Sequence, residues 1–110
     1  MDERLEQEIN LLHALVCQAL ADPKRILILY AIAEKPRYVS ELAEMLHLPQ
    51  PTVSRHLKVL RERSLVTTER DGVAVYYSLA DKRVVKALDL LRAVLADVLT
   101  QQGQLAQIIA

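Results

Sequence analysis

The segment from Pro51 to Arg63 carries side chains that suit contact with the edges of DNA bases. At 100° per residue its apolar side chains gather on one ridge and its polar side chains on the opposite face. Arg55 can donate two hydrogen bonds to a guanine, and Thr52 can contact a base edge or a thymine methyl. Other polar side chains of this segment and its start can hold phosphates: Gln50, Ser54, His56, Lys58 and Arg61. We expect His56 to pack against the protein as well.

Charge is unevenly distributed along the chain. The 14 basic and 14 acidic residues give a formal net charge of +0, which excludes a histone-like polycation and an acidic tail. Between His47 and Arg70, however, five basic residues stand against two acidic ones. The alternative is a polar face that is merely solvated. We favour a basic patch that contacts DNA, because a turn and a hairpin are predicted beside it.

Length and composition predict one domain over residues 1–110, mainly α-helical because the chain has only 2 glycines and 4 prolines. Cys17 is the one cysteine, so no internal disulfide can form, and we expect a cytoplasmic protein. The longest apolar run, Ile26 to Ala33, is far shorter than the roughly 20 residues of a membrane span. The start of the chain also lacks a leader pattern, so we expect neither secretion nor membrane insertion.

Helical periodicity positions the polar segment within a helix-turn-helix. An amphipathic helix is predicted over residues 3–21, and Asp22 with Pro23 is typical of the start of a second helix that ends near Glu34. A short third helix follows over 40–47, and a fourth over 51–63 buries the ridge of Val53, Leu57 and Leu60. Two short helices joined by a tight turn predict a helix-turn-helix over residues 39–63.

A change of period after Leu65 predicts a β-hairpin over residues 65–79. Asp71 and Gly72 form a type I′ loop signal between two β-prone runs. A loop at these two residues pairs Arg70 with Val73, Thr68 with Val75 and Val66 with Tyr77. Side chains on the inward face are therefore Val66, Val75 and Tyr77, and one of Tyr76 and Tyr77 should pack on the core.

The last helix is predicted over residues 81–102, with Asp81 as its cap and a tail over 103–110. This helix and the one over 3–21 carry apolar stripes longer than a monomer can cover. A homodimer through these two helices is the simplest cover. Twofold symmetry would then place two recognition helices about 34 Å apart, the spacing of successive major grooves. The fold class is thus mainly α with a small β-hairpin, a dimeric winged helix-turn-helix.

Several segments resemble the ArsR/SmtB family of bacterial and archaeal repressors across roughly Ala21 to Leu79. They are Asp22 to Arg25, Leu42 to Leu46, Pro51 to Leu60 with its core Val53 to Leu57, Leu65-Val66, and Tyr76 to Leu79. The resemblance implies a homodimer that binds a palindromic operator at its own promoter and releases it when an inducer, often a metal ion, arrives. It also implies that the first and last helices form the dimer interface.

Two positions depart from the family pattern. Pro49 stands where a serine commonly caps the recognition helix, so Gln50 becomes the expected boundary residue and Pro51 the first helical position. In the hairpin, Arg70 is the one basic residue and Val73 replaces a frequent basic residue. The sequence therefore predicts a weaker helix cap and a weaker contact between the hairpin and DNA.

The family's usual metal ligands are not found. Residues 39–48 contain no cysteine and residues 81–102 contain no histidine. His13 and Cys17, four residues apart on the first helix, could supply two ligands for zinc, nickel or cobalt, completed by Asp89 or Asp97 of either chain. The favoured interpretation is no metal: a half-buried thiol and a surface imidazole, with the inducer unidentified. His47 is interpreted as a cation at a helix C-terminus.

Two other functional classes compete with a DNA-binding regulator. An enzyme is excluded because the sequence has no glycine-rich phosphate loop, no nucleophile with a nearby base and no paired carboxylates. A winged-helix module that binds protein instead of DNA is the alternative, and the zero net charge favours it slightly. Salt separates these two, since affinity that depends on phosphate neutralisation falls steeply with salt.

Overall fold

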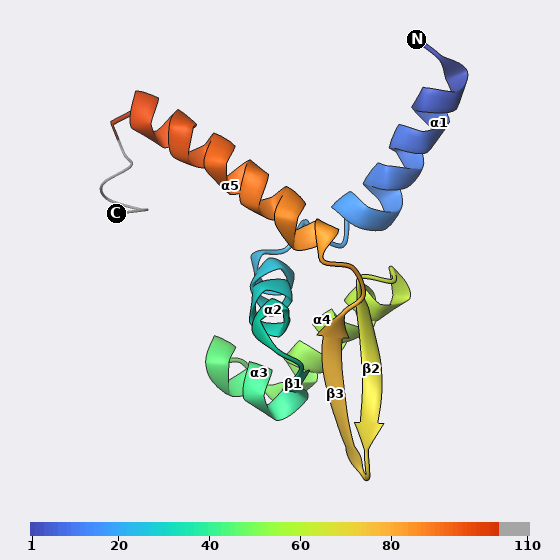
Figure 1. Ribbon diagram of the computed structural model, residues 1–110, viewed down its shortest axis with the longest axis vertical. Coiled ribbons are helices and arrows are strands. Elements are labelled where there is room, and N and C mark those ends of the chain that lie inside the picture. Colours follow the sequence, from blue (N-terminus) through green and yellow to red (C-terminus); the bar gives the residue numbers. More distant parts are fainter. Residues whose placement is uncertain (104–110) are drawn as a thin grey trace.

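The computed structural model describes residues 1–103, and helices dominate them (Figure 1). In chain order the elements are α1 (Glu3–Leu12), a π-helical turn η1 (His13–Cys17), α2 (Pro23–Glu34), β1 (Arg37–Tyr38), α3 (Val39–Leu46), α4 (Gln50–Glu62), β2 (Val66–Asp71), β3 (Ala74–Leu79) and α5 (Arg83–Gln101). This order confirms the predicted winged helix-turn-helix. The predicted tail over 103–110 lies outside the described residues from 104 onward.

The hydrophobic core forms where α2, α3 and α4 meet the sheet. Helix α2 contributes more buried residues to it than any other element, and its Ile28 and Leu29 are completely buried. The predicted ridge of α4 is confirmed, since Val53, Leu57 and Leu60 are at most 1% exposed. Val66 of β2 and Leu88 of α5 close the cluster. Burial of the ridge fixes which face of α4 points outward, because the polar side chains lie opposite.

Aspartates begin three of the helices. The side chains of Asp2 and Asp22 accept hydrogen bonds from the backbone N–H groups of Arg4 (2.9 Å) and Lys24 (2.8 Å). Asp81, the predicted cap of α5, likewise accepts from the N–H of Arg83 at 2.8 Å, but the N-cap is Lys82 and the helix begins at Arg83, two residues later than predicted. These bonds satisfy amide groups that have no partner inside the helix. The first turns of α1, α2 and α5 are thus specified locally by sequence.

The prediction of one regular helix over 3–21 was wrong between His13 and Cys17. There the helix widens into a π-helical turn, and the N–H of Gln18 bonds the carbonyl of His13 at 3.0 Å. A π-turn takes an extra residue, which rotates the following residues relative to those before. After this turn Ala19 is buried at 1% exposure, whereas no residue of α1 is buried.

The two helices of the helix-turn-helix each begin one residue earlier than predicted. Helix α3 starts at Val39, and Glu41 accepts a hydrogen bond from the N–H of Tyr38 at 3.1 Å. The predicted cap of α4 was also off by one. Pro49 is the N-cap, Gln50 the first helical residue, and the carbonyl of Pro49 accepts the N–H groups of Thr52 and Val53. The proline caps without a side-chain hydrogen bond, which agrees with a weaker cap.

The predicted register of the hairpin was wrong by two residues. Val66 pairs with Leu79, Thr68 with Tyr77 and Arg70 with Val75, so the loop is Gly72 and Val73. Gly72 has φ of 64° and Val73 does not have a positive φ. This arrangement is typical of a type II′ turn, which requires left-handed backbone only at its first position, a glycine. Asp71 therefore does not have to adopt a left-handed backbone conformation.

This two-residue difference in register does not change which side chains face inward, because side chains along a strand alternate with a period of two residues. Val66 is buried, and Tyr77 and Leu79 pack against the core, as the alternation predicted for Val66 and Tyr77. A third strand was missed: β1 pairs with β3, aligning Arg37 with Tyr77. The sheet order is therefore β1-β3-β2, all antiparallel.

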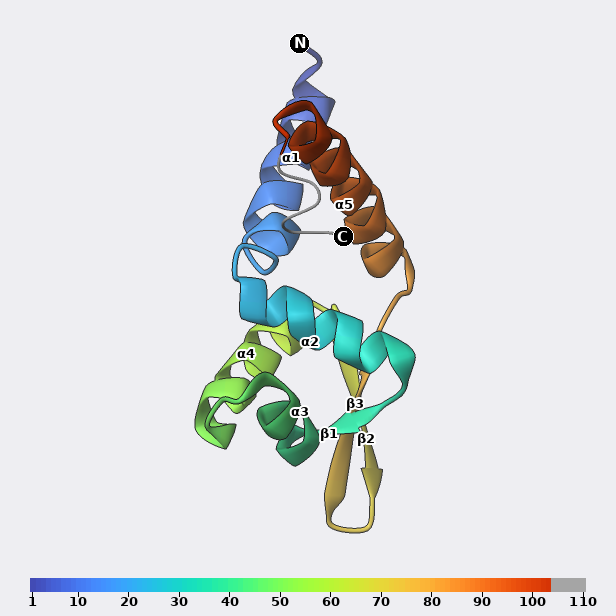
Figure 2. The same cartoon turned by 90° about the vertical axis from the view of Figure 1, so that its left-hand side faces the viewer.

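Helices α1 and α5 project from this body as two arms (Figure 1). They leave the body on the side away from the hairpin loop, and α2 lies between them and the helix-turn-helix (Figure 2). None of the helices within residues 1–103 combines the length and apolarity required to cross a membrane. The body and the arms thus occupy opposite ends of the molecule.

Two valines provide a matched test of the core. Val53→Ala removes two methyl groups from a side chain with 0% exposure, whereas Val73→Ala removes the same groups from one with 101% exposure. We expect Val53→Ala to lower the free energy of unfolding by about 2 kcal/mol and Val73→Ala to change it by less than about 0.5 kcal/mol. Urea unfolding followed by circular dichroism measures both. Equal losses would contradict the core described here.

Candidate nucleic-acid interface

The outward face of α4 presents most of the polar side chains that the sequence singled out. Gln50, Ser54, Arg55, Lys58 and Arg61 are exposed there, and Thr52 is half-buried. The Arg55 guanidinium donates a hydrogen bond to the Thr52 hydroxyl at 3.3 Å, so these two side chains lie together near the start of the helix. The face is therefore continuous and hydrophilic from the first turn to the last.

The cations of this face are free of carboxylate partners. Within residues 1–103, the arginines that form ion pairs are Arg25, Arg37, Arg83 and Arg92. Arg55, Lys58, Arg61 and Arg70 form none there. A cation without a carboxylate partner can approach a phosphate or a base without first breaking an ion pair. The local excess of positive charge is thus available to a ligand.

His56 differs from the other predicted side chains of α4. It is half-buried, and its Nδ1 lies 3.5 Å from Nη1 of Arg25 on α2. Because a guanidinium only donates, Nδ1 must be the acceptor in this contact. The predicted packing role is therefore confirmed, whereas its predicted phosphate contact is not tested by this arrangement. Sequence reasoning missed Arg25, whose contact partner on α4 lies 31 residues away.

The hairpin extends away from the arms and ends in an apolar tip (Figure 2). Arg70 is exposed and lies opposite Val75, two residues from the loop. The neighbouring positions Glu69 and Asp71 are acidic and exposed, and Val73 at the tip is fully exposed. The hairpin thus offers one cation between two anions, much less positive charge than α4 offers.

Two tyrosines connect the hairpin to the start of α3. The Tyr38 hydroxyl donates a hydrogen bond to the Tyr76 hydroxyl, and the ring centroids are 4.1 Å apart. This bond raises the pKa of Tyr38 to about 12, because it stabilises the neutral phenol. The alternation along the strand predicted that Tyr77 packs on the core. Tyr77 does, and Tyr76 pairs with Tyr38 on the other face of the sheet.

His13 and Cys17 both lie on the π-helical turn and are exposed. The expectation of a half-buried thiol was therefore wrong, whereas the imidazole lies on the surface as expected. Residues 1–103 contain no group of three or more histidine, cysteine, aspartate or glutamate side chains that could hold a metal ion. Asp89, considered as a third ligand, accepts a hydrogen bond from the Tyr30 hydroxyl at 2.6 Å and pairs with Arg92. Burial and that bond raise the pKa of Tyr30. Asp89 therefore joins α5 to α2.

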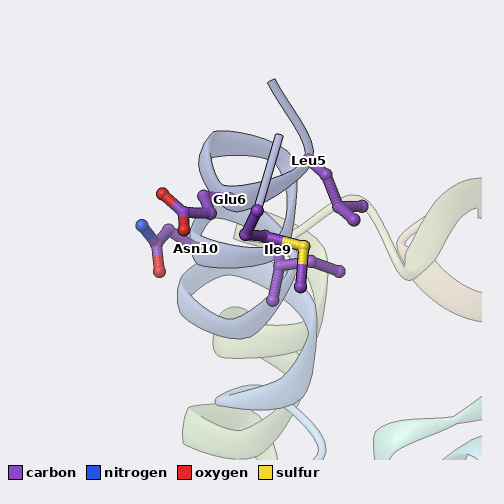
Figure 3. A pocket seen from close by; sticks show the side chains of 5 residues that line it. Leu5, Glu6, Ile9 and Asn10 are labelled. Atoms are coloured by element: carbon purple, nitrogen blue, oxygen red, sulfur yellow. The ribbon is translucent and has the colours of Figure 1, made fainter. Parts of the chain in front are cut away.

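Apolar stripes cover the outer surfaces of both arms. Figure 3 shows Leu5 and Ile9 on one side of α1, with Glu6 and Asn10 on the other, around a shallow pocket. Leu5 and Ile9 are 42% and 47% exposed. On α5 the exposed apolar side chains are Leu90, Leu91, Val94, Leu95 and Val98. Patches of this length on a small domain are typical of a surface that another chain covers.

Comparison with known proteins gives matches of one kind. The family model described as bacterial regulatory protein, arsR family, matches residues 22–68. The HTH-type transcriptional repressor SmtB of Mycobacterium tuberculosis is 52% identical over 64 residues, 58% of this chain and 47% of that protein. This chain therefore spans about half the length of that curated relative.

Solved structures extend the similarity to most of the chain. The crystal structure of NolR from Sinorhizobium fredii is 34% identical with a TM-score of 0.76, covering 86% of this chain and 93% of that one. A solution structure from Mycobacterium bovis, described as a homodimeric winged helix-turn-helix DNA-binding domain, is 29% identical with a TM-score of 0.72. The alignment covers 86% of each chain.

The tyrosine pair can be tested by titration. Tyr76→Phe removes the acceptor of the Tyr38 hydroxyl, so we expect the pKa of Tyr38 to fall from about 12 toward the ordinary value of about 10. NMR of tyrosine labelled at Cζ follows each phenol separately. Tyr77→Phe, one residue away on the opposite face, is the control and should leave the pKa of Tyr38 unchanged. An unmoved Tyr38 in Tyr76→Phe would contradict the pairing.

Proposed function

This chain belongs to the arsR family of bacterial regulatory proteins, and we propose that it is a sequence-specific DNA-binding repressor of transcription that acts as a homodimer on a palindromic operator in the cytoplasm. The observation that carries this proposal is the outward face of α4. It bears exposed cations without carboxylate partners, opposite a fully buried apolar ridge. The winged helix-turn-helix presents such a face to the major groove.

Each polar side chain of this face takes a role that follows from its chemistry. Arg55 contacts a guanine through two parallel hydrogen bonds, and Thr52 contacts a neighbouring base edge. Phosphate contacts come from Gln50, Ser54, Lys58 and Arg61, with Arg70 adding one from the hairpin. His56 packs against Arg25 and lies near the backbone of the duplex. Because the hairpin carries a single cation between two acids, α4 supplies most of the affinity.

The partner of the apolar arms is a second copy of the same chain. Both stripes lie on the end of the molecule away from the hairpin loop (Figure 2), so a dimer through α1 and α5 leaves both copies of α4 free. The described homodimeric relative has the same fold. Twofold symmetry then presents two recognition helices to successive major grooves on one side of the duplex, about 34 Å apart.

No bound metal is required for this function. His13 and Cys17 would supply two ligands to zinc, nickel or cobalt, and a third would have to come from elsewhere, such as Asp97 of either chain. We expect a chelator to leave operator affinity unchanged, as should the double substitution of His13→Ala and Cys17→Ser. Fluorescence anisotropy with and without added zinc measures this. A zinc effect that the double substitution abolishes would instead assign a metal-responsive site to this turn.

The contrast between Arg55 and Lys58 tests base contact against phosphate contact. After selection of a binding site from random duplexes, Arg55→Ala should lose about 1–3 kcal/mol on that site and relax the preference at one base position. Lys58→Ala should weaken all duplexes alike and reduce the slope of log affinity against log salt by about 1. Anisotropy titrations across salt concentrations measure both effects.

Two outcomes would overturn these assignments. Equal effects of both substitutions on selected and unrelated duplexes would contradict the division of roles. Affinity for DNA that hardly changes with salt, or no affinity at all, would favour the alternative of a protein-binding module.

The dimer is tested by a charge placed on either side of α1. Ile9→Lys puts an ammonium into the apolar stripe, and we expect a loss of about 2 kcal/mol or more, ~30-fold in the dissociation constant of the dimer. Asn10→Lys adds the same charge about 100° around the helix, beside Glu6 on its polar face (Figure 3), and should leave the dimer intact. Sedimentation velocity over a concentration series distinguishes them. Two equally dimeric variants would exclude α1 from the interface.

A further inference from the structure

We propose that Arg25 sets the angle between the α1 arm and the recognition helix α4, and thereby determines the spacing of half-sites that the dimer accepts. This inference rests on the proposed function, since a half-site spacing exists only for a dimer on DNA. Arg25 is a positioning residue here. It acts through the backbone of the arm and through His56, and it is not proposed to contact DNA.

The contacts of Arg25 join three parts of the chain. Its Nε donates to the carbonyl of Ala19 at 2.6 Å and its Nη2 to the carbonyl of Gln18 at 3.1 Å. Its Nη1 lies 3.5 Å from Nδ1 of His56 and 3.7 Å from the carboxylate of Asp22. The side chain is 16% exposed. One planar guanidinium thus holds the end of the arm, the start of α2 and the side of α4.

This contact matters because the arm has little else to hold it. No residue of α1 is buried, and at the junction Ala19 is buried while Leu20 is half-buried. The guanidinium of Arg25 donates to the carbonyl of Ala19 and to that of Gln18, which also accepts the N–H of Ala21 at 3.2 Å. These two bonds connect the segment that follows the arm to α2, and so tie the direction of the arm to the body (Figure 2).

Because the arm is long, a small rotation at its junction with α2 would change the half-site spacing that the dimer fits. Fifteen residues from Glu3 to Cys17 span about 22 Å at about 1.5 Å per residue. A rotation of about 10° at the junction therefore moves the far end by about 4 Å, close to the ~3.4 Å rise of one base pair. A fixed joint is required if the dimer is to distinguish operators that differ by one base pair between half-sites.

The contact to His56 connects the same joint to the recognition helix. α5 is also tied to α2, through the Tyr30 hydroxyl and Asp89, but that bond does not touch α4. Arg25, in contrast, contacts both the end of the arm and α4. A fork of five fixed donors can bridge two carbonyls and an imidazole at once, whereas a lysine ammonium presents a single charged nitrogen.

The experiment uses the full-length dimer and palindromes built from the selected site, with the half-sites moved apart or together by one and two base pairs. The wild type should prefer one spacing by about tenfold or more over its neighbours at one base pair. Arg25→Met keeps an unbranched stem but removes the donors. It should reduce that preference to less than about threefold, with the dimer dissociation constant unchanged. A loss of folded protein alone would weaken all spacings equally.

Lys24→Met is the matched control, because it removes a positive charge from the neighbouring position, which is exposed. It should keep the wild-type spacing profile. If Arg25→Met does not fold, Arg25→Lys replaces it and should also flatten the profile. A folded variant at position 25 that retains the full wild-type preference overturns the inference, as does a wild type indifferent to spacing. A wild type that binds no duplex overturns the proposed function itself.

Discussion

Burial of α2 is the constraint on which the rest of the structure depends. This helix supplies Ile28, Leu29, Ala31 and Ile32 to the core, against which α3, α4 and the sheet pack, and both arms are also held to it by polar contacts. Arg25 at its start holds the end of the first arm, and Tyr30 in its middle holds α5 through Asp89. Both arms are therefore attached to the same helix, α2. The packing of α4 against α2 sets the orientation of the polar face of α4.

Two pairs of arginines have contrasting surroundings. Arg25 and Arg37 are mostly buried, with side-chain exposures of 16% and 12%, and each bonds a backbone carbonyl and a carboxylate. Such pairing satisfies the donors that burial takes from water. Arg55 and Arg61 on α4 are exposed and unpaired within residues 1–103. Arg25 and Arg37 thus have their partners within the chain, whereas Arg55 and Arg61 remain available for the ligand that the proposed function requires.

Sequence periodicity predicted the helices, the buried ridge and the outward face of α4, because each depends on neighbours within a few residues. It did not predict the hairpin register, since Asp71-Gly72 and Gly72-Val73 offer the same glycine to two different turns. The strand at Arg37 and Tyr38 is too short to show a period. The contacts of Arg25 with His56 and of Tyr38 with Tyr76 join residues 31 and 38 positions apart, and only the folded chain brings them together.

Zero net charge conceals a separation of charge along the molecule. Residues 1–21 contain four acidic and one basic residue, whereas residues 47–70 contain two acidic and five basic ones. The acidic arm and the basic α4 lie at opposite ends of the body (Figure 2). Under the proposed function, this arrangement repels the acidic arm from a polyanionic duplex and attracts α4 to it, so it orients the encounter before any base is contacted. A neutral total charge also limits attraction at other surfaces, which leaves affinity to the face that carries specificity.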